Sequence, residues 1–227
     1  MKKVFLLALC FPLYVGLFAQ QIRQVIQSQS GAKTSFCFFA DQSIIINVSP
    51  DGIVTEWGVE YAEGRMYYYP GKLDKYMGRI DMYGAADNES FRGKLRYIGA
   101  VAITYYSAEE NKFLAGKVKS VGSSIIDYFT RFEEEALRGK IKSAGTVSMS
   151  YYGSFDNEAL KGKLKLVSNI GISYYSSFDD KAIKGKLKSV GNFPFTYYSS
   201  FDTRMQGAIK TGFQKQIIDG IRFIIWG

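Results

Sequence analysis

The most constraining feature of this sequence is an internal repeat of fixed length. Glycine followed by lysine and an aliphatic residue recurs every 23 residues, at positions 93, 116, 139, 162 and 185. The two most regular units read GKIKSAGTVSMSYYGSFDNEALK from Gly139 and GKLKLVSNIGISYYSSFDDKAIK from Gly162. A diverged unit begins at Gly71, and a decaying one at Gly207. A fixed period with atypical ends is typical of stacked units that bury their apolar faces against each other.

Each unit contains the pattern of a β-hairpin. In the unit at Gly162, Ile170, Ile172 and Tyr174 alternate with small or polar residues, which is the period of a half-buried strand. The corresponding apolar sets in other units are Val101, Ile103 and Tyr105; Val147, Met149 and Tyr151; and Phe193, Phe195 and Tyr197.

The rest of the unit supplies a second strand and two connections. The shorter first strand is expected to alternate as Lys163, Leu164, Lys165 and Leu166, and a tight turn near residues 168–169 joins it to the second strand. The longer connector, residues 177–185, is expected to form one helical turn with Phe178 and Ile183 pointing inward.

Equivalent lysines help to choose between two β architectures. In a parallel β-solenoid they would stack about 4.8 Å apart as ladders of like charge, whereas an antiparallel meander spaces them about 10 Å apart with tyrosine between them. The meander has less repulsion and allows cation–π contacts. We therefore predict an all-β fold, an antiparallel β-meander of 23-residue hairpins, with a β-solenoid as the alternative.

The two ends of the chain differ from the repeat. Lys2 and Lys3 precede an apolar run that ends near Ala19, which predicts a secretory signal peptide over residues 1–19 and an exported protein. Residues 20–70 are expected to form N-terminal strands and a hairpin, residues 71–206 the repeat array, and residues 207–227 a C-terminal hairpin. We expect the two terminal hairpins to cap the ends of the array and cover its edges.

The repeat also carries a family resemblance. The unit G-K-[LIV]-K-S-[VA]-G followed by [ST]-Y-Y-x-S-F-D, with IVTEWG at 53–58 upstream, resembles exported 23-residue-repeat proteins of Gram-negative bacteria, a family with no assigned activity. The resemblance implies export and a β-repeat fold, and it carries over no catalytic or binding residue.

Catalytic chemistry finds little support in the residue types. The chain has no histidine, which removes the imidazole base of a Ser-His-Asp triad and histidine-ligated metals. Paired acids such as Asp179 and Asp180 recur from unit to unit, so we interpret them as turn and cap residues. Cys37 is expected to be a buried small hydrophobe. We expect no enzyme activity, no cofactor and no metal site.

The basic and aromatic residues of the repeat are the candidate binding surface. The chain has a formal net charge of +8, and an extended anionic polymer or glycan could contact a regular row of weak sites. The candidate residues are Lys94, Arg96, Tyr106, Lys117, Lys119, Lys140, Lys142, Tyr152, Lys163, Lys165, Tyr175, Lys186, Lys188 and Tyr198.

The interpretation we favour is a secreted or cell-envelope structural or interaction protein, with an anionic polysaccharide or another envelope component as its partner. Export argues against nucleic acid as the partner. A small outer-membrane β-barrel is the alternative, although strands of about six residues with lysine on one face differ from membrane strands of roughly 9–11 residues.

Overall fold

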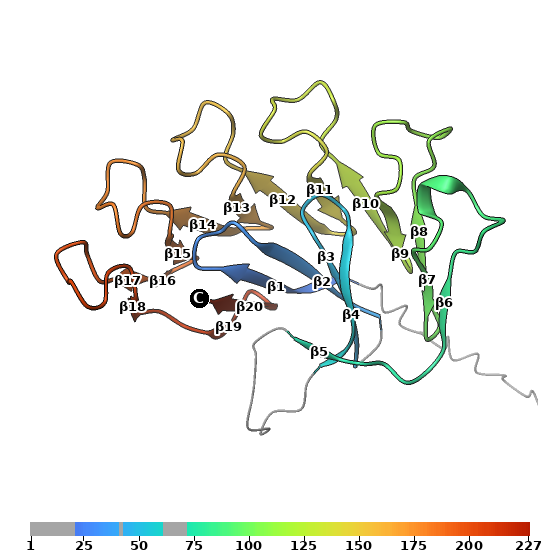
Figure 1. Cartoon of the computed structure of the whole chain (residues 1–227), viewed down its shortest axis with the longest axis horizontal. Helices are drawn as coiled ribbons and strands as arrows, with labels where there is room; N and C mark the ends of the chain where they lie inside the picture. The colour runs from blue at the N-terminus through green and yellow to red at the C-terminus, as the bar shows by residue number, and fades with distance from the viewer. Residues whose placement is uncertain (1–20, 41–42, 61–71) are drawn as a thin grey trace, which may run out of the picture.

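The protein is all-β and consists mainly of two sheets, as a computed structural model shows for residues 21–40, 43–60 and 72–227 (Figure 1). The predicted signal peptide, residues 1–19, and part of the unit at Gly71 lie outside these described residues. Within them no helix is long and apolar enough to cross a membrane.

The repeat units form a curled, half-barrel sheet of 11 strands, here called the repeat sheet (Figure 1). Its strands follow each other in chain order and pair antiparallel, which confirms the predicted meander and shows that the solenoid alternative is wrong. The strands are β6 (Ile80–Met82), β7 (Leu95–Ile98), β8 (Val101–Tyr105), β9 (Val118–Val121), β10 (Ser124–Tyr128), β11 (Ile141–Ala144), β12 (Val147–Tyr151), β13 (Leu164–Val167), β14 (Ile170–Tyr174), β15 (Leu187–Val190) and β16 (Phe193–Pro194).

A β-bulge recurs at one position of every unit. In β13, for example, Ser150 pairs with Leu166 and Tyr151 with Leu164, so Lys165 is the extra residue. The predicted alternation of the first strand is therefore wrong, because the bulge lets Leu164 and Val167 both point inward. A bulge also bends its strand and increases its twist, and its repetition explains the curl of the sheet.

The second strands follow their predicted pattern except in the last unit. Ile170, Ile172 and Tyr174 are buried, as are the equivalent residues of β8 and β12. Phe193 is 38% exposed, contrary to prediction, because the strand is interrupted at Pro194, which has no amide hydrogen to donate. After this break, β17 (Thr196–Tyr197) pairs with β18 (Ile209–Thr211) instead.

The two ends of the chain form a second sheet, here called the terminal sheet, in the order β19-β20-β1-β2-β3-β4-β5. Its two segments are joined by a parallel pairing of the first described strand with the last, in which Ile26 lies opposite Ile224. The strands are β1 (Ile22–Ser28), β2 (Thr34–Phe39), β3 (Ile44–Val48), β4 (Val54–Glu60), β5 (Leu73–Asp74), β19 (Lys215–Ile218) and β20 (Ile221–Trp226).

The terminal sheet corrects the expected placement of the terminal hairpins. They do not cap the ends of the array; they join each other, and one face of their sheet packs on the inner face of the repeat sheet. Phe36, Phe38 and Phe223 share one buried cluster with Ile103, Ile172 and other inward residues of the repeat. Covering the large apolar inner face contributes more to stability than covering one strand edge, because burial scales with area.

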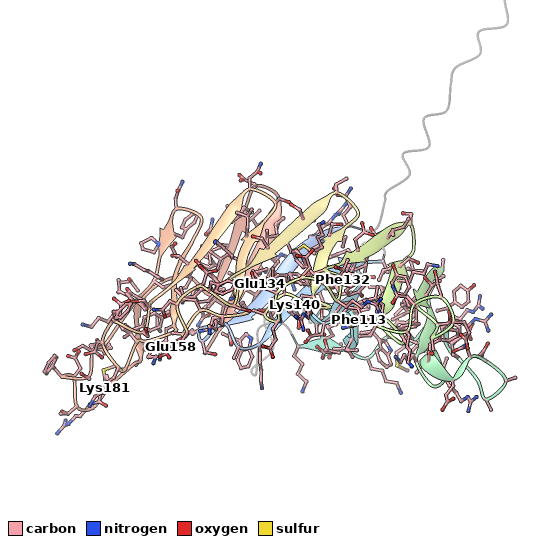
Figure 2. All side chains as sticks on the ribbon, turned by 90° about the horizontal axis from the view of Figure 1, so that it is seen from above. Phe113, Phe132, Glu134, Lys140, Glu158 and Lys181 are labelled. Carbon is pink, nitrogen blue, oxygen red and sulfur yellow. The ribbon has the colours of Figure 1, made fainter. Side chains whose placement is uncertain are left out.

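The long connectors between units lie along one edge of the repeat sheet, where Lys181, Glu158 and Phe132 mark three successive connectors in Figure 2. In the connector at 177–185 the expected helical turn is present, because the amide of Lys184 donates to the carbonyl of Asp180 at 2.9 Å, Asp180 Oδ1 accepts the amide of Ala182, and Gly185 ends the turn with a φ of +73°. The one short 3-10 helix of the described residues is η1 (Glu89–Phe91). Ile183 packs on the core as expected, but Phe178 is 93% exposed, so its predicted inward orientation is wrong. Its equivalents Phe132, Phe155 and Phe201 are equally exposed.

Candidate functional site

The predicted basic surface divides into two rows with different environments. The first lysine of each unit, here called an inner lysine, is partly buried; the set is Lys94, Lys117, Lys140, Lys163 and Lys186. Four of the five donate a hydrogen bond to the glycine carbonyl that opens the next unit, for example Lys117 Nζ to Gly139 O at 3.0 Å and Lys163 to Gly185. Burial lowers the pKa of these four lysines. Four of the five inner lysines therefore bond one unit to the next, and their ammonium groups already have a hydrogen-bond partner.

The second basic residue of each unit, here called an outer cation, stands at the bulge; the set is Arg96, Lys119, Lys142, Lys165 and Lys188. Each charged group lies 5.0–5.9 Å from the ring centre of an aromatic residue in the preceding unit, for example Lys165 over Tyr152. The expected cation–π contacts are therefore present. The outer cations point away from the core and are more accessible than the inner lysines.

The tyrosines of the predicted surface are structural neighbours of these cations. Tyr152 and Tyr175 are half-buried and donate their hydroxyls to backbone carbonyls one unit further on, at 3.1 and 3.0 Å, and Tyr106 lies in the same arrangement. Their rings meet the next buried tyrosine edge-on. Tyr198, beyond the break at Pro194, lies under Lys210 instead. The rings of Tyr106, Tyr152 and Tyr175 thus lie beneath the ammonium groups of Lys119, Lys165 and Lys188.

One unit departs from the arrangement of its neighbours. The buried Tyr105, Tyr128 and Tyr174 donate their hydroxyls to the carbonyls of Leu95, Val118 and Leu164, whereas the buried hydroxyl of Tyr151 has no partner among the described residues. Tyr197, next to the break at Pro194, also has none. The inner lysine of the same unit, Lys140, does not share the hydrogen bond that the other four donate to the next glycine; its ammonium lies 3.9 Å from Asp51 Oδ1.

The terminal sheet explains where this departure occurs. The turn between β3 and β4 contacts the units on one side: the carbonyls of Gly52 and Pro50 accept the amides of Val118 and Ile141 at 2.9 and 2.7 Å. The turn between β1 and β2 contacts the other side, where Gln29 accepts the amide of Leu187 at 2.7 Å. The intermediate residue Leu164 lines a cleft between the two turns instead.

Glycine allows both turns to approach the repeat sheet closely. Gly52 and Gly31 have φ angles of +77° and +68°, and a Cβ at either would collide with the ring of Tyr128 or Tyr174. These turns therefore cover the tyrosines on either side of Tyr151 but leave Tyr151 beside the cleft.

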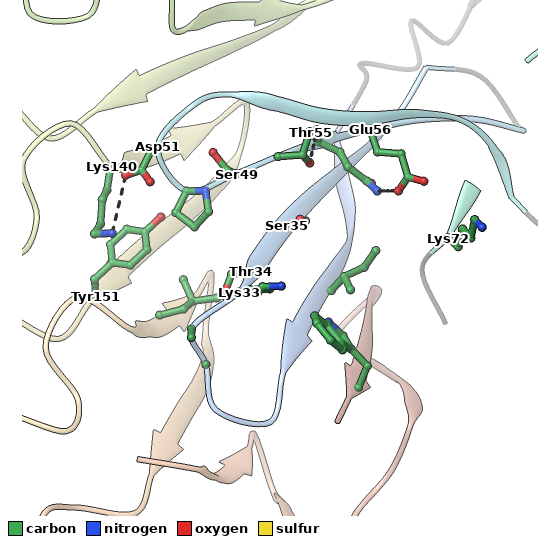
Figure 3. Close-up of a pocket in the computed structure, with 18 residues that line it drawn as sticks. Lys33, Thr34, Ser35, Ser49, Asp51, Thr55, Glu56, Lys72, Lys140 and Tyr151 are labelled. Atoms are coloured by element: carbon green, nitrogen blue, oxygen red, sulfur yellow. Dashed lines mark hydrogen bonds and ion pairs between the residues drawn. The ribbon is translucent and has the colours of Figure 1, made fainter. Parts of the chain in front are cut away.

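The cleft has a volume of about 760 Å³ and is lined by both sheets (Figure 3). Its buried end contains Tyr151 and Leu164, and its exposed end contains Lys33, Lys72 and Trp226. The other lining residues are Ile26, Gly31, Ala32, Thr34, Ser35, Asn47, Ser49, Pro50, Asp51, Thr55, Glu56, Lys140 and Gly162. Asn47 is 3% exposed, and its Oδ1 has no hydrogen-bond partner in the described part of the chain.

Other titratable groups do not assemble into a catalytic or metal site within the described residues. Asp156, Asp179 and Asp202 accept backbone amides at 2.6–2.8 Å, so their interpretation as turn residues is confirmed. No group of three or more metal-ligating side chains is present in these ranges. Cys37 is fully buried as predicted, and burial raises the pKa of its thiol to about 12. A thiol in that state is not a nucleophile at neutral pH.

Comparison of the chain with protein-family models, with curated proteins and with solved structures finds no match. The candidate surfaces therefore rest on the geometry of this chain.

Sequence reasoning found the basic rows but missed the cleft. Of the predicted surface, Lys140 alone lines it, and Tyr151 was assigned only to the core. Nothing in the repeat marks Tyr151, because its unit is among the most regular of the chain. The cleft depends on the Ser49-Pro50-Asp51-Gly52 turn, which contacts the repeat sheet. The sequence predicts this turn, but no local pattern specifies its contact with the repeat.

Proposed function

We propose that this is an exported interaction protein, without enzyme activity, that binds an extended anionic polysaccharide along the outer face of its repeat sheet. The row of outer cations, one at the bulge of each unit, carries this proposal. The basic start of the chain and its apolar run support export.

The spacing of the row suits a polymer. Equivalent cations are separated by two strands, which corresponds to about 10 Å. That distance is close to the length of a disaccharide in an extended chain, so one charged group in each disaccharide could meet one cation. Each contact is weak alone, and several along one chain give avidity.

The charge balance of the face leaves cations available to a ligand. Lys119 forms an ion pair with Glu110, and Arg79 forms one with Asp81 at 2.5 Å. Lys142 and Lys165 have no ion pair with the described residues, and both are exposed. The aromatic ring beneath each holds the side chain in place, which reduces the entropy lost on binding.

The test is retention of the mature chain on immobilised polygalacturonate at low and high salt. We expect retention at low salt that falls steeply as salt rises, because exposed charges are screened. The variant K119Q/K142Q/K165Q should lose most of this retention.

A matched control carries the same change of charge elsewhere. Lys112, Lys161 and Lys181 are exposed on the long connectors, and K112Q/K161Q/K181Q should bind like the parent chain. Equal losses for the two triple variants would show that only net charge matters, and no retention of the parent chain at low salt would overturn the proposal.

A further inference from the structure

We propose that the cleft between the two turns of the terminal sheet is a second binding site, which takes a small sugar acid such as a hexuronate. This site lies apart from the outer cations, and the proposal does not depend on polymer binding to that row.

The first observation is a pair of buried polar atoms that lack partners and line the same cleft. They are the hydroxyl of Tyr151, a side chain 5% exposed, and Oδ1 of Asn47, a side chain 3% exposed. An unpaired buried polar atom costs about 1–3 kcal/mol. A polyhydroxylated ligand in the cleft would supply a hydrogen-bond partner to the hydroxyl of Tyr151 or to Asn47 Oδ1, so its binding would remove this cost at that atom.

The second observation is that the equivalents of Tyr151 and Lys140 in other units form hydrogen bonds that these two residues lack. Three equivalent tyrosines bond to their own units, and four equivalent lysines bond to the next glycine. Tyr151 and Lys140 make neither bond, and both line the cleft. In Figure 3 the Tyr151 hydroxyl points toward the turn that carries Ser49 and Asp51. These two side chains of the unit are therefore available to the cleft.

The chemistry of the lining indicates the ligand class. Thr34, Ser35, Ser49 and Thr55 add hydroxyls, and the half-buried Trp226 offers the flat apolar surface on which a pyranose ring packs. Lys33 and Lys72 lie at the exposed end without an ion pair to the described residues; Lys33 Nζ is 5.6 Å from the Trp226 ring centre. A ring with several hydroxyls and one carboxylate matches the hydroxyls, the aromatic surface and the positive charge of this lining.

The acidic residues of the cleft are already engaged. Asp51 faces Lys140, and Glu56 accepts Asn47 Nδ2 and the amide of Leu73, each at 3.2 Å. The unpaired charge of the lining is therefore positive. The volume of about 760 Å³ lies within the range of roughly 300–1,000 Å³ that is usual for small-molecule sites.

The test is isothermal titration calorimetry of the mature protein with D-glucuronate and, separately, with D-glucose. We expect saturable binding of glucuronate and at least tenfold weaker binding of glucose, which lacks the carboxylate. Tyr151→Phe should weaken glucuronate binding about tenfold, since it removes one buried hydrogen bond to the ligand. Lys33→Gln should weaken glucuronate binding while leaving glucose binding unchanged.

Two controls separate this site from other effects. Tyr105→Phe removes a buried hydroxyl that bonds within its own unit, outside the cleft, and should leave glucuronate binding unchanged. The variant K119Q/K142Q/K165Q should also bind glucuronate normally, so this result stands whether or not the outer row binds a polymer. No saturable glucuronate binding, equal affinity for glucose, or full affinity in Tyr151→Phe would each overturn the proposal.

Discussion

The repeat sheet and the terminal sheet differ in how regular their contacts are. In the repeat sheet the units share a bulge and an aromatic ring that lies edge-on to a tyrosine of the next unit, and in four of the five units the inner lysine donates to the next glycine. The terminal sheet has no repeat, and one of its pairings joins the first and last described strands across nearly the whole chain. The repeat sheet contains only pairings between successive strands, whereas the terminal sheet also contains one long-range pairing, which joins its two segments.

In a periodic protein, a distinct site arises where a non-repeating part contacts the repeat. A uniform array presents the same surface in every unit and contains no single distinct site. The terminal sheet contacts that array with two turns, and between them one unit loses its regular bonds. The irregular sheet therefore gives one of several equivalent units a different chemical environment.

The largest expected effect concerns the core that the sheets share. Ile172→Asp in the repeat sheet and Phe223→Asp in the terminal sheet should each abolish folding or cost several kcal/mol, because both side chains are buried at 2% exposure or less. Ile125→Asp is the matched control on the outer face, where the side chain is 63% exposed, and it should change stability little.

Denaturant unfolding followed by circular dichroism and by tryptophan fluorescence checks this prediction. One shared core predicts coincident transitions. A Phe223→Asp protein that keeps a cooperatively folded repeat sheet would show that the two sheets are independent.

The next effect is alkaline unfolding. Burial raises the pKa of Tyr105, Tyr128, Tyr174 and Tyr197 above the ordinary 10.0. The folded state therefore holds protons that the unfolded state releases, so the contribution of these tyrosines is complete below about pH 10 and is lost as pH rises further. The lowered pKa of the inner lysines acts in the opposite direction, but these side chains are only partly buried.

Tyrosinate absorbance recorded together with circular dichroism measures this effect. We expect most tyrosines to ionise together with unfolding. Smooth ionisation of all tyrosines near pH 10 with the fold intact would contradict the buried placement of these rings.

A smaller effect separates the two rows of cations. The sequence suggests that Lys163 is exposed and replaceable, but the structure corrects this, because Lys163 is partly buried and donates to Gly185. Lys163→Met should cost about 1 kcal/mol by removing that bond, whereas Lys165→Met should stay within about 0.5 kcal/mol. Thermal unfolding of the pair checks the assignment, and equal losses would mean that the rows do not differ structurally.

The sequence predicts the repeat sheet well because its determinants are local. Alternation in Ile170, Ile172 and Tyr174 and the turn at Ser168 specify a hairpin, and Ser168 adopts the positive φ of 50° that glycine has in other units. The bulge at Lys165 is not predictable from the sequence, because Lys163, Leu164, Lys165 and Leu166 alternate in polarity as in a regular strand. Only the pairing with the neighbouring strand shows that Lys165 is an extra residue.

The terminal sheet was only partly predictable for the same reason. The hairpin sequences around Ser49-Pro50-Asp51-Gly52 and Asp219-Gly220 indicate strands, but the pairing of Ile26 with Ile224 depends on contacts between distant segments. The cleft depends on that packing as well, which is why its key hydroxyl was assigned to the core.

The most direct test of the account compares one substitution at three equivalent positions: Tyr128→Phe, Tyr151→Phe and Tyr174→Phe. We expect the two flanking variants to lose about 1 kcal/mol of unfolding free energy, because their hydroxyls bond to the carbonyls of Val118 and Leu164. Tyr151→Phe should lose nothing or become more stable, since its hydroxyl has no partner in the described chain. Equal losses at all three positions would show that the array is uniform and contradict the account.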